Sequence, residues 1–122
     1  MIDHRLGEVE TKFAKIIWRE APLPSSELVK ICRTELNWNK STTYTVLRKL
    51  CNRGIFKNEN TIVSVVMTED EFNSAAGEEF VDELFKGSLP AFIAAFTSRK
   101  ELSVSDVAEI KRMIAEYAEK AK

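Results

Sequence analysis

Residues 37–50 read NWNKSTTYTVLRKL, and their spacing predicts a short helix over about residues 40–52, ended by Gly54. At about 100° per residue, one side of this helix is apolar and the opposite side is polar. The polar side comprises Ser41, Thr42, Thr45, Arg48, Lys49 and Asn52, with Tyr44 at its border. It contains no Asp or Glu, although a solvated helix face usually includes some. The pattern therefore favours a helix that meets a negatively charged partner.

The charge distribution along the chain is uneven, although the formal net charge is only −1. Residues 1–68 carry 11 Lys and Arg against 7 Asp and Glu, whereas residues 69–122 carry 7 against 12. The densest positive stretch, residues 40–57, holds Lys40, Arg48, Lys49, Arg53 and Lys57 without any acid. Such a stretch attracts a polyanion. Charge alone is equally compatible with a solvated basic helix.

Further helices and two strands are predicted around this helix. In chain order, the predictions are helices over about 6–20, 25–35 and 40–52, and strands over about 55–57 and 62–67. The APLP stretch at residues 21–24 ends the first helix, and Ser25 or Ser26 is predicted to cap the second. Trp38 is predicted to anchor the intervening turn against the core. Three helices followed by a hairpin is the order of a winged helix-turn-helix.

Three amphipathic helices are predicted beyond residue 68, with caps at Thr68, Ser88 and Ser103. Their apolar side chains form the predicted dimer interface, which comprises Phe80, Leu84, Phe85, Leu89, Phe92, Ile93, Phe96, Ile110, Ile114 and Tyr117. About 50 residues in three such helices seldom bury enough surface to fold alone. The alternative is that they fold back on the N-terminal half as one monomeric core. The predicted fold class is mainly α, with a winged helix-turn-helix domain in residues 1–68 and a three-helix dimerisation region in residues 69–122.

Enzymatic, metal-binding and membrane functions find little support in the sequence. It lacks G-x-x-x-x-G-K-[ST], G-x-G-x-x-G and G-x-S-x-G, and His4 is its single histidine. Cys32 and Cys51 lie 19 positions apart without a C-x-x-C pair, so both are predicted to be core thiols and no metal or cofactor is expected. No apolar run approaches the roughly 18 residues of a membrane helix, and no signal segment is evident. A cytoplasmic protein that is not an enzyme is predicted.

Double-stranded DNA is the polyanion that best explains the helix over residues 40–52. Ser41, Thr42 and Thr45 are short enough to let the backbone approach base edges in a major groove. Arg48 is predicted to reach a guanine or a phosphate, and Lys40 and Tyr44 to hold phosphates. Arg53 and Lys57, with Lys49 as a further candidate, are predicted to follow the DNA backbone. The alternative is a winged helix that binds protein without a DNA target, a class that loses the basic, acid-free face.

Three stretches resemble the penicillinase repressor family, the BlaI/MecI transcriptional repressors. Residues 6–18, LGEVETKFAKIIW, are similar to its LGxLExxVMxxxW opening. Residues 38–50, WNKSTTYTVLRKL, resemble its WxxxTxxTxLxRL recognition helix. Residues 80–96, FVDELFKGSLPAFIAAF, resemble its dimerisation segment with a GSLxxLxxxF turn. The resemblance implies a homodimeric repressor that binds an inverted-repeat operator through a winged helix on each subunit.

The resemblance also implies a further partner, but this chain departs from the family pattern in two places. In the family, a membrane sensor with a zinc protease domain commonly leads to cleavage in the dimerisation segment. That cut typically lies at an Asn-Phe pair, whereas this chain has Ala95-Phe96. The predicted hairpin is shorter than the family's and has Glu59 at its tip. A weak contact of the wing with DNA is therefore expected.

Overall fold

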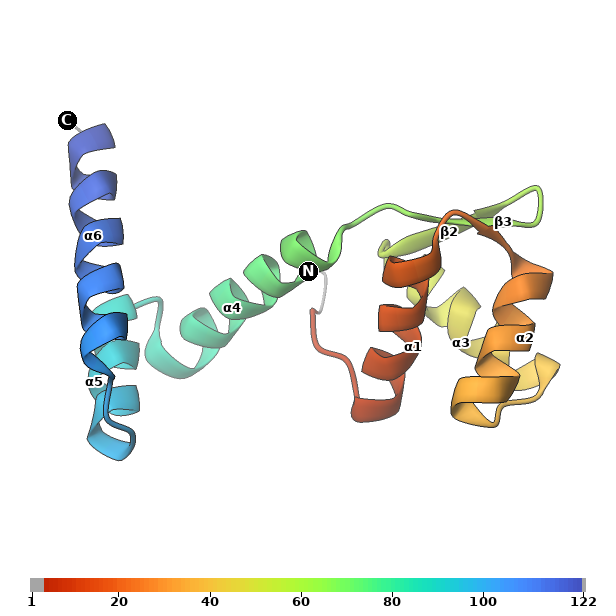
Figure 1. The fold of residues 1–122 in the computed structure, drawn as a ribbon, viewed down its shortest axis with the longest axis horizontal. Helices are drawn as coiled ribbons and strands as arrows, with labels where there is room; N and C mark the ends of the chain where they lie inside the picture. The colour runs from red at the N-terminus through yellow and green to blue at the C-terminus, as the bar shows by residue number, and fades with distance from the viewer. Residues whose placement is uncertain (1–3, 122) are drawn as a thin grey trace. The chain divides into compact units, whose positions relative to one another are not determined.

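The computed structural model describes residues 4–121 and contains six helices and three short strands in that range (Figure 1). The elements are α1 (Glu8–Glu20), β1 (Leu23–Pro24), α2 (Ser25–Leu36), α3 (Lys40–Asn52), β2 (Phe56–Glu59), β3 (Ile62–Val65), α4 (Glu69–Phe85), α5 (Leu89–Arg99) and α6 (Val104–Lys120). This order confirms the predicted winged helix followed by a helical arm, the name used below for helices α4, α5 and α6. The chain divides into two compact units, the first ending at Phe80 and the second beginning at Val81.

The sheet of the first unit has the strand order β1-β3-β2, with both pairs antiparallel. Phe56 lies opposite Val65, and the hairpin turns at Asn60 and Thr61, which both have positive φ angles. Leu23 of β1 lies opposite Val63, which adds a third strand that the sequence analysis did not predict. Because β1 has only two residues and one is proline, it has no alternation to detect.

The core of the first unit lies between α1, α2, α3 and the sheet. Its fully buried side chains include Phe13, Ile17, Leu28, Leu47, Leu50, Ile55, Phe56 and Val63. Trp38 stacks on Phe13 with ring centroids 5.3 Å apart, which confirms its predicted role as an anchor. Cys32 is buried as predicted, and this burial raises the pKa of its thiol to about 11. Cys51 is only half-buried.

The first turns of α4 belong to this core. Phe72 is buried, its ring lies 5.6 Å from that of Trp18, and the Trp18 Nε1 donates to the carbonyl of Met67. His4 reaches the same helix, where its Nδ1 lies 2.5 Å from Glu79 Oε1. The first unit therefore extends through part of α4, beyond the domain boundary proposed at residues 68–69.

Most predicted helix caps are confirmed. Thr68 and Glu71 form a capping box, and the hydroxyls of Ser88 and Ser103 accept from the backbone N–H groups of Ala91 and Asp106. The predicted cap of α2 is wrong, because Pro24 is the N-cap and no side chain caps this helix. Ser25 instead lies inside its first turn with a buried side chain that accepts a hydrogen bond from the Tyr44 hydroxyl.

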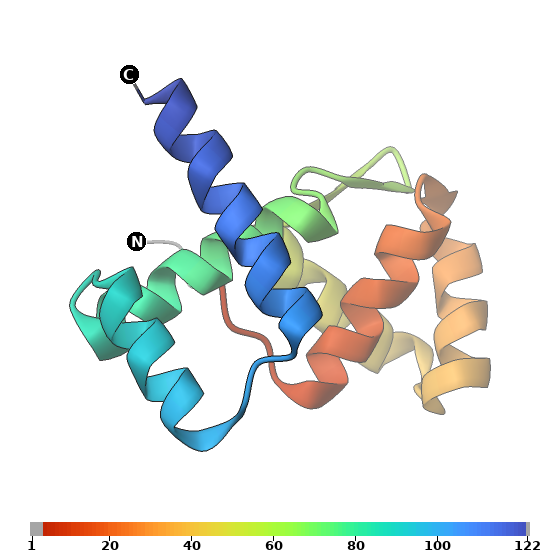
Figure 2. The same ribbon diagram turned by 60° about the vertical axis from the view of Figure 1, so that its left-hand side comes forward.

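The second unit contains the end of α4 with α5 and α6, and the latter two helices run in roughly opposite directions (Figure 2). The Phe92 ring lies 5.6 Å from Phe85 and 6.0 Å from Phe96. Neither α5 nor α6 contains a buried residue. An apolar groove of about 290 Å³ between them is lined by Leu89, Ile93, Leu102, Val107, Ile110, Lys111, Met113 and Ile114. Within the described residues, no helix is long and apolar enough to span a membrane.

Candidate nucleic-acid interface

The outward side of α3 is the polar side predicted from its sequence. Lys40, Ser41, Thr45, Arg48, Lys49 and Asn52 are exposed, and Thr42 and Tyr44 are half-buried. Thr43, Leu47 and Leu50 are buried on the opposite side. A helix of 13 residues thus presents hydroxyl, amide and cationic groups to the exterior while its aliphatic side is fixed in the core.

The N-terminal end of α3 begins at a well-defined cap. The Asn39 side chain accepts from the Thr42 backbone N–H at 2.8 Å, and the buried Thr43 hydroxyl donates to the Asn39 carbonyl. Within residues 4–121, the exposed hydroxyls of Ser41 and Thr45 have no hydrogen-bond partner. Both remain available to donate to or accept from an external group. The first turn contains no acid, which suits the positive end of a helix dipole facing an anion.

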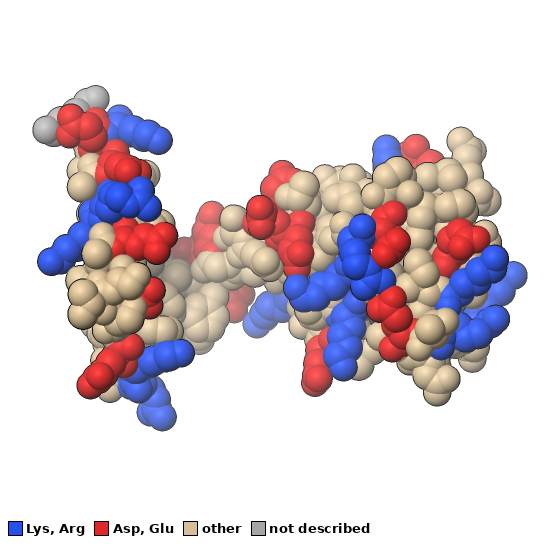
Figure 3. Space-filling view, viewed as in Figure 1, with Lys and Arg blue, Asp and Glu red and all other residues tan. Residues whose placement is uncertain are grey.

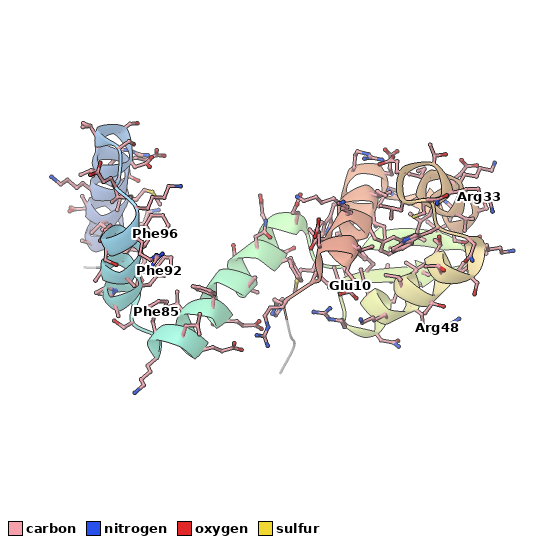
Figure 4. The ribbon with its side chains drawn as sticks, turned by 90° about the horizontal axis from the view of Figure 1, so that it is seen from below. Glu10, Arg33, Arg48, Phe85, Phe92 and Phe96 are labelled. Atoms are coloured by element: carbon pink, nitrogen blue, oxygen red, sulfur yellow. The ribbon has the colours of Figure 1, made fainter. Side chains whose placement is uncertain are left out.

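Two cations of the predicted site are available for an external partner. Lys40 and Arg48 are exposed, and neither has an ion-pair partner in the part of the chain that the structure describes. Figure 4 shows Arg48 on the outer side of α3. Its side chain borders an open hollow of about 250 Å³ that is also lined by Tyr44, Leu47, Cys51 and Asn58. The hollow therefore lies between α3, the candidate recognition helix, and strand β2 of the wing.

Tyr44 uses its hydroxyl inside the protein. The hydroxyl donates to the Ser25 Oγ at 3.0 Å, which ties the middle of α3 to the first residue of α2. Its ring is half-buried. A phosphate contact by Tyr44 stays a prediction, and a phosphate oxygen would have to compete with Ser25 for the hydroxyl proton.

The remaining three cations of residues 40–57 have partners within the chain. Lys49 Nζ lies 2.7 Å from Glu10 Oε2, and Arg53 Nη2 donates to the Arg5 carbonyl at 2.7 Å. Lys57 Nζ lies 3.8 Å from Glu59 Oε2 in the wing. Sequence reasoning missed the first of these contacts because Glu10 precedes Lys49 by 39 positions. The opening of α1 gave no local signal that its acid faces the end of α3.

The side of the first unit that carries α1 has a different charge pattern. There, Lys and Arg alternate with Asp and Glu over the surface (Figure 3). Lys15 pairs with Glu69 and Arg19 with Glu35, both at 2.6 Å. Such exposed pairs balance their own charge, and each contributes at most about 1 kcal/mol. These pairs on the α1 side contrast with Lys40 and Arg48 of α3, which have no ion-pair partner within the described residues.

Comparison with known sequences assigns the chain to a family. The family described as "Penicillinase repressor" matches residues 6–116, nearly the whole chain. The chain belongs to the penicillinase repressor family. The penicillinase repressor of Bacillus licheniformis is 20% identical over 122 residues, which cover 97% of this chain and 95% of that protein. The resemblance seen in the sequence is confirmed, and membership supports a role in transcriptional repression, which is not a class of enzyme.

The predicted interface residues of this family member lie on α4, α5 and α6. Phe80, Leu84, Leu89, Ile93, Phe96, Ile114 and Tyr117 are exposed, and Phe85, Phe92 and Ile110 are half-buried. Ala95 and Phe96 are exposed within α5, where cleavage between them would require the helix to unwind locally. Among the described residues, no group of three or more His, Cys, Asp or Glu is arranged to hold a metal ion.

Proposed function

We propose that this member of the penicillinase repressor family is a homodimeric repressor that binds a dyad-symmetric operator through α3 of each subunit. The observation that carries the proposal is the outward face of α3, which combines exposed hydroxyls and cations without a carboxylate. The alternative, a winged helix that binds protein only, has no need for this basic face. Family membership adds independent support for repression of transcription.

The chemistry of α3 suits a major groove. Ser41, Thr42 and Thr45 are short, so the helix N-terminus can approach base edges, and their hydroxyls can bond bases or phosphates. The methyl group of a threonine can contact the methyl group of thymine. Arg48, one turn further along from Thr45, can form two hydrogen bonds to a guanine or hold a phosphate. Lys40 at the start of the helix is a phosphate contact in this proposal.

Dimerisation through the arm would double this recognition. Exposed apolar side chains on α5 and α6, such as Leu89, Ile114 and Tyr117, are 57%, 63% and 76% exposed. A two-fold symmetric dimer uses the same patch on both subunits. Two recognition helices would then contact half-sites about 34 Å apart, so the operator should be an inverted repeat.

Fluorescence anisotropy tests this function directly. Purified protein is titrated against the DNA upstream of its own gene and against a scrambled version, from about 50 to 200 mM salt. We expect tighter binding to the upstream DNA, with an affinity that falls steeply as salt rises because cation contacts release counterions. Equal and weak binding to both DNAs would remove the upstream region as the operator, and selection from genomic fragments would follow. Failure to bind any fragment would refute the proposal.

A further inference from the structure

The C-terminal end of α3 is tied to the start of α1 through Glu10. One carboxylate oxygen, Oε2, lies 2.7 Å from Lys49 Nζ, while the other, Oε1, accepts from the Gly7 backbone N–H at 3.1 Å. Figure 4 shows Glu10 on α1, where it belongs to the first turn of the helix. The carboxylate thus has one oxygen for its own helix and one for α3.

Glu10 is held in its charged form by these neighbours. The hydrogen bond from Lys49 and that from Gly7 lower the pKa of Glu10, and the charge of Arg53 lowers it further. The Glu10 side chain is only 23% exposed, whereas that of Lys49 is 60% exposed. Glu10 is therefore the fixed member of the pair, and Lys49 is the more solvated one.

This pair divides the cations of α3 into two groups. Lys40 and Arg48 have no ion-pair partner within residues 4–121, whereas Lys49 already faces a fixed negative charge. If Lys49 turned toward a phosphate, Glu10 would lose its partner beside a polyanion. The gain from the new contact would then be offset by repulsion between the Glu10 carboxylate and the phosphate. Lys49 should therefore add little to DNA binding while Glu10 is charged.

We propose that Glu10 is a positioning residue that holds Lys49 out of the DNA contact, so that phosphate binding along α3 ends at Arg48. This inference rests on the proposed function, because it concerns which cations of α3 meet DNA. It replaces the sequence-based expectation that Lys49 follows the DNA backbone. It also assigns a role in DNA recognition to a residue of α1, outside the helix that lies in the groove.

The test is a cycle of Glu10→Gln, Lys49→Gln and the double variant, with the salt dependence of binding to random DNA as the readout. Glutamine keeps an oxygen that can accept from Gly7, so the start of α1 is preserved while the charge is lost. Releasing one cation per subunit should steepen the plot of log affinity against log salt by about 0.9 per subunit. Adding Lys49→Gln to Glu10→Gln should return the slope to that of the wild type.

Glu8→Gln is the matched control. Glu8 is on the same turn of α1 but is 87% exposed, and its nearest cation, Lys12, lies 3.9 Å away on its own helix. Its loss changes the net charge by the same amount without releasing a cation of α3. A steeper slope in Glu10→Gln but not in Glu8→Gln supports the proposal, because a general change in charge or stability would affect both.

Two results would overturn it. The first is an unchanged slope in Glu10→Gln, and the second is a slope that Lys49→Gln alone flattens by about 0.9 per subunit, which means that Lys49 contacts phosphate beside Glu10. Elution from heparin provides a measurement that does not depend on DNA recognition. If no form bound DNA, the proposed function would fail, whereas Glu10→Gln should still elute from heparin at higher salt than Glu8→Gln. Equal elution of these two variants would refute the role of Glu10.

Discussion

The two units of this repressor differ in where their apolar side chains lie. Every buried apolar side chain within residues 4–121 comes from the first unit. In the second unit, α5 and α6 contain no fully buried residue, and large side chains such as Leu84, Val104 and Tyr117 are 63%, 88% and 76% exposed. One chain is therefore enough to build the core of the first unit, whereas the second unit leaves large apolar side chains exposed.

The difference indicates how stability should depend on protein concentration. The first unit has its own packed core, so its stability should not change with concentration. The arm needs a second surface for its exposed side chains, so if a second copy supplies that surface, the stability of the arm should rise with concentration. Variants placed in each unit can break or sharpen this contrast.

The largest effect is expected from Phe56→Ala in the first unit. Phe56 is 1% exposed in β2 and its ring lies 5.5 Å from Trp18, so truncation leaves a cavity in the core. We expect a loss of about 3 to 5 kcal/mol in the free energy of unfolding. Denaturant unfolding at two protein concentrations measures it. Ile62→Ala, on the same hairpin but 41% exposed, is the control and should cost far less. A loss that disappeared at high concentration would contradict an independent core.

The next largest effect is expected from Ile114→Asp in the arm. Ile114 is 63% exposed on α6, so a carboxylate there costs little in one subunit but would be buried in a dimer interface. We expect monomers by sedimentation velocity and operator binding weakened by about 100-fold or more, because two linked half-sites become two separate events. Ser105→Asp places the same charge on the polar side of α6 and should leave the dimer intact. A dimer that survives Ile114→Asp would place the interface elsewhere.

Features that lie within one segment of the chain could be predicted from the sequence. The helices could be predicted because apolar residues recur with the helical period within each segment. The caps at Thr68, Ser88 and Ser103 could be predicted because each hydroxyl accepts a hydrogen bond from a backbone N–H only three residues further along. The outward side of α3 followed from the same period. These features are local, so a single stretch of sequence contains the whole signal.

Contacts between distant segments were not predictable in this way. The Glu10–Lys49 pair, the Tyr44–Ser25 hydrogen bond and the pairing of Leu23 with Val63 join segments that only the fold brings together. The predicted cap at Ser25 is wrong for this reason, since the Ser25 hydroxyl accepts a hydrogen bond from Tyr44 of another helix. The number of cations in residues 40–57 can be counted from the sequence, but which of them have a partner in the protein depends on the fold.

Arg48→Ala is expected to have a moderate effect confined to DNA binding. If Arg48 contacts a base, its loss should cost about 1 to 3 kcal/mol on the operator and little on random DNA. Lys40→Ala is the comparison, since a phosphate contact should weaken both DNAs by a similar factor and flatten the salt dependence. Anisotropy titrations on both DNAs distinguish the two. Unchanged affinity of Arg48→Ala on both DNAs would exclude Arg48 from the interface.

The smallest effect is expected from removing a helix cap, which can be done in both units. Asn39→Ala removes the acceptor for the Thr42 N–H at the start of α3, and Ser103→Ala removes the equivalent acceptor at the start of α6. Each should cost about 1 kcal/mol of helix stability. Thermal unfolding at two concentrations should show a loss that is independent of concentration for Asn39→Ala and a midpoint that rises with concentration for Ser103→Ala.

Asn39→Ser separates the structural role of this cap from a direct contact with DNA. Serine at an N-cap still accepts the hydrogen bond, so Asn39→Ser should recover most of the stability that Asn39→Ala loses. If both variants bound the operator equally weakly while only Asn39→Ala was destabilised, the amide itself would be a DNA contact. If affinity instead followed stability, Asn39 would act through the first turn of α3, because the core that fixes this helix also sets the direction of Ser41 and Thr45.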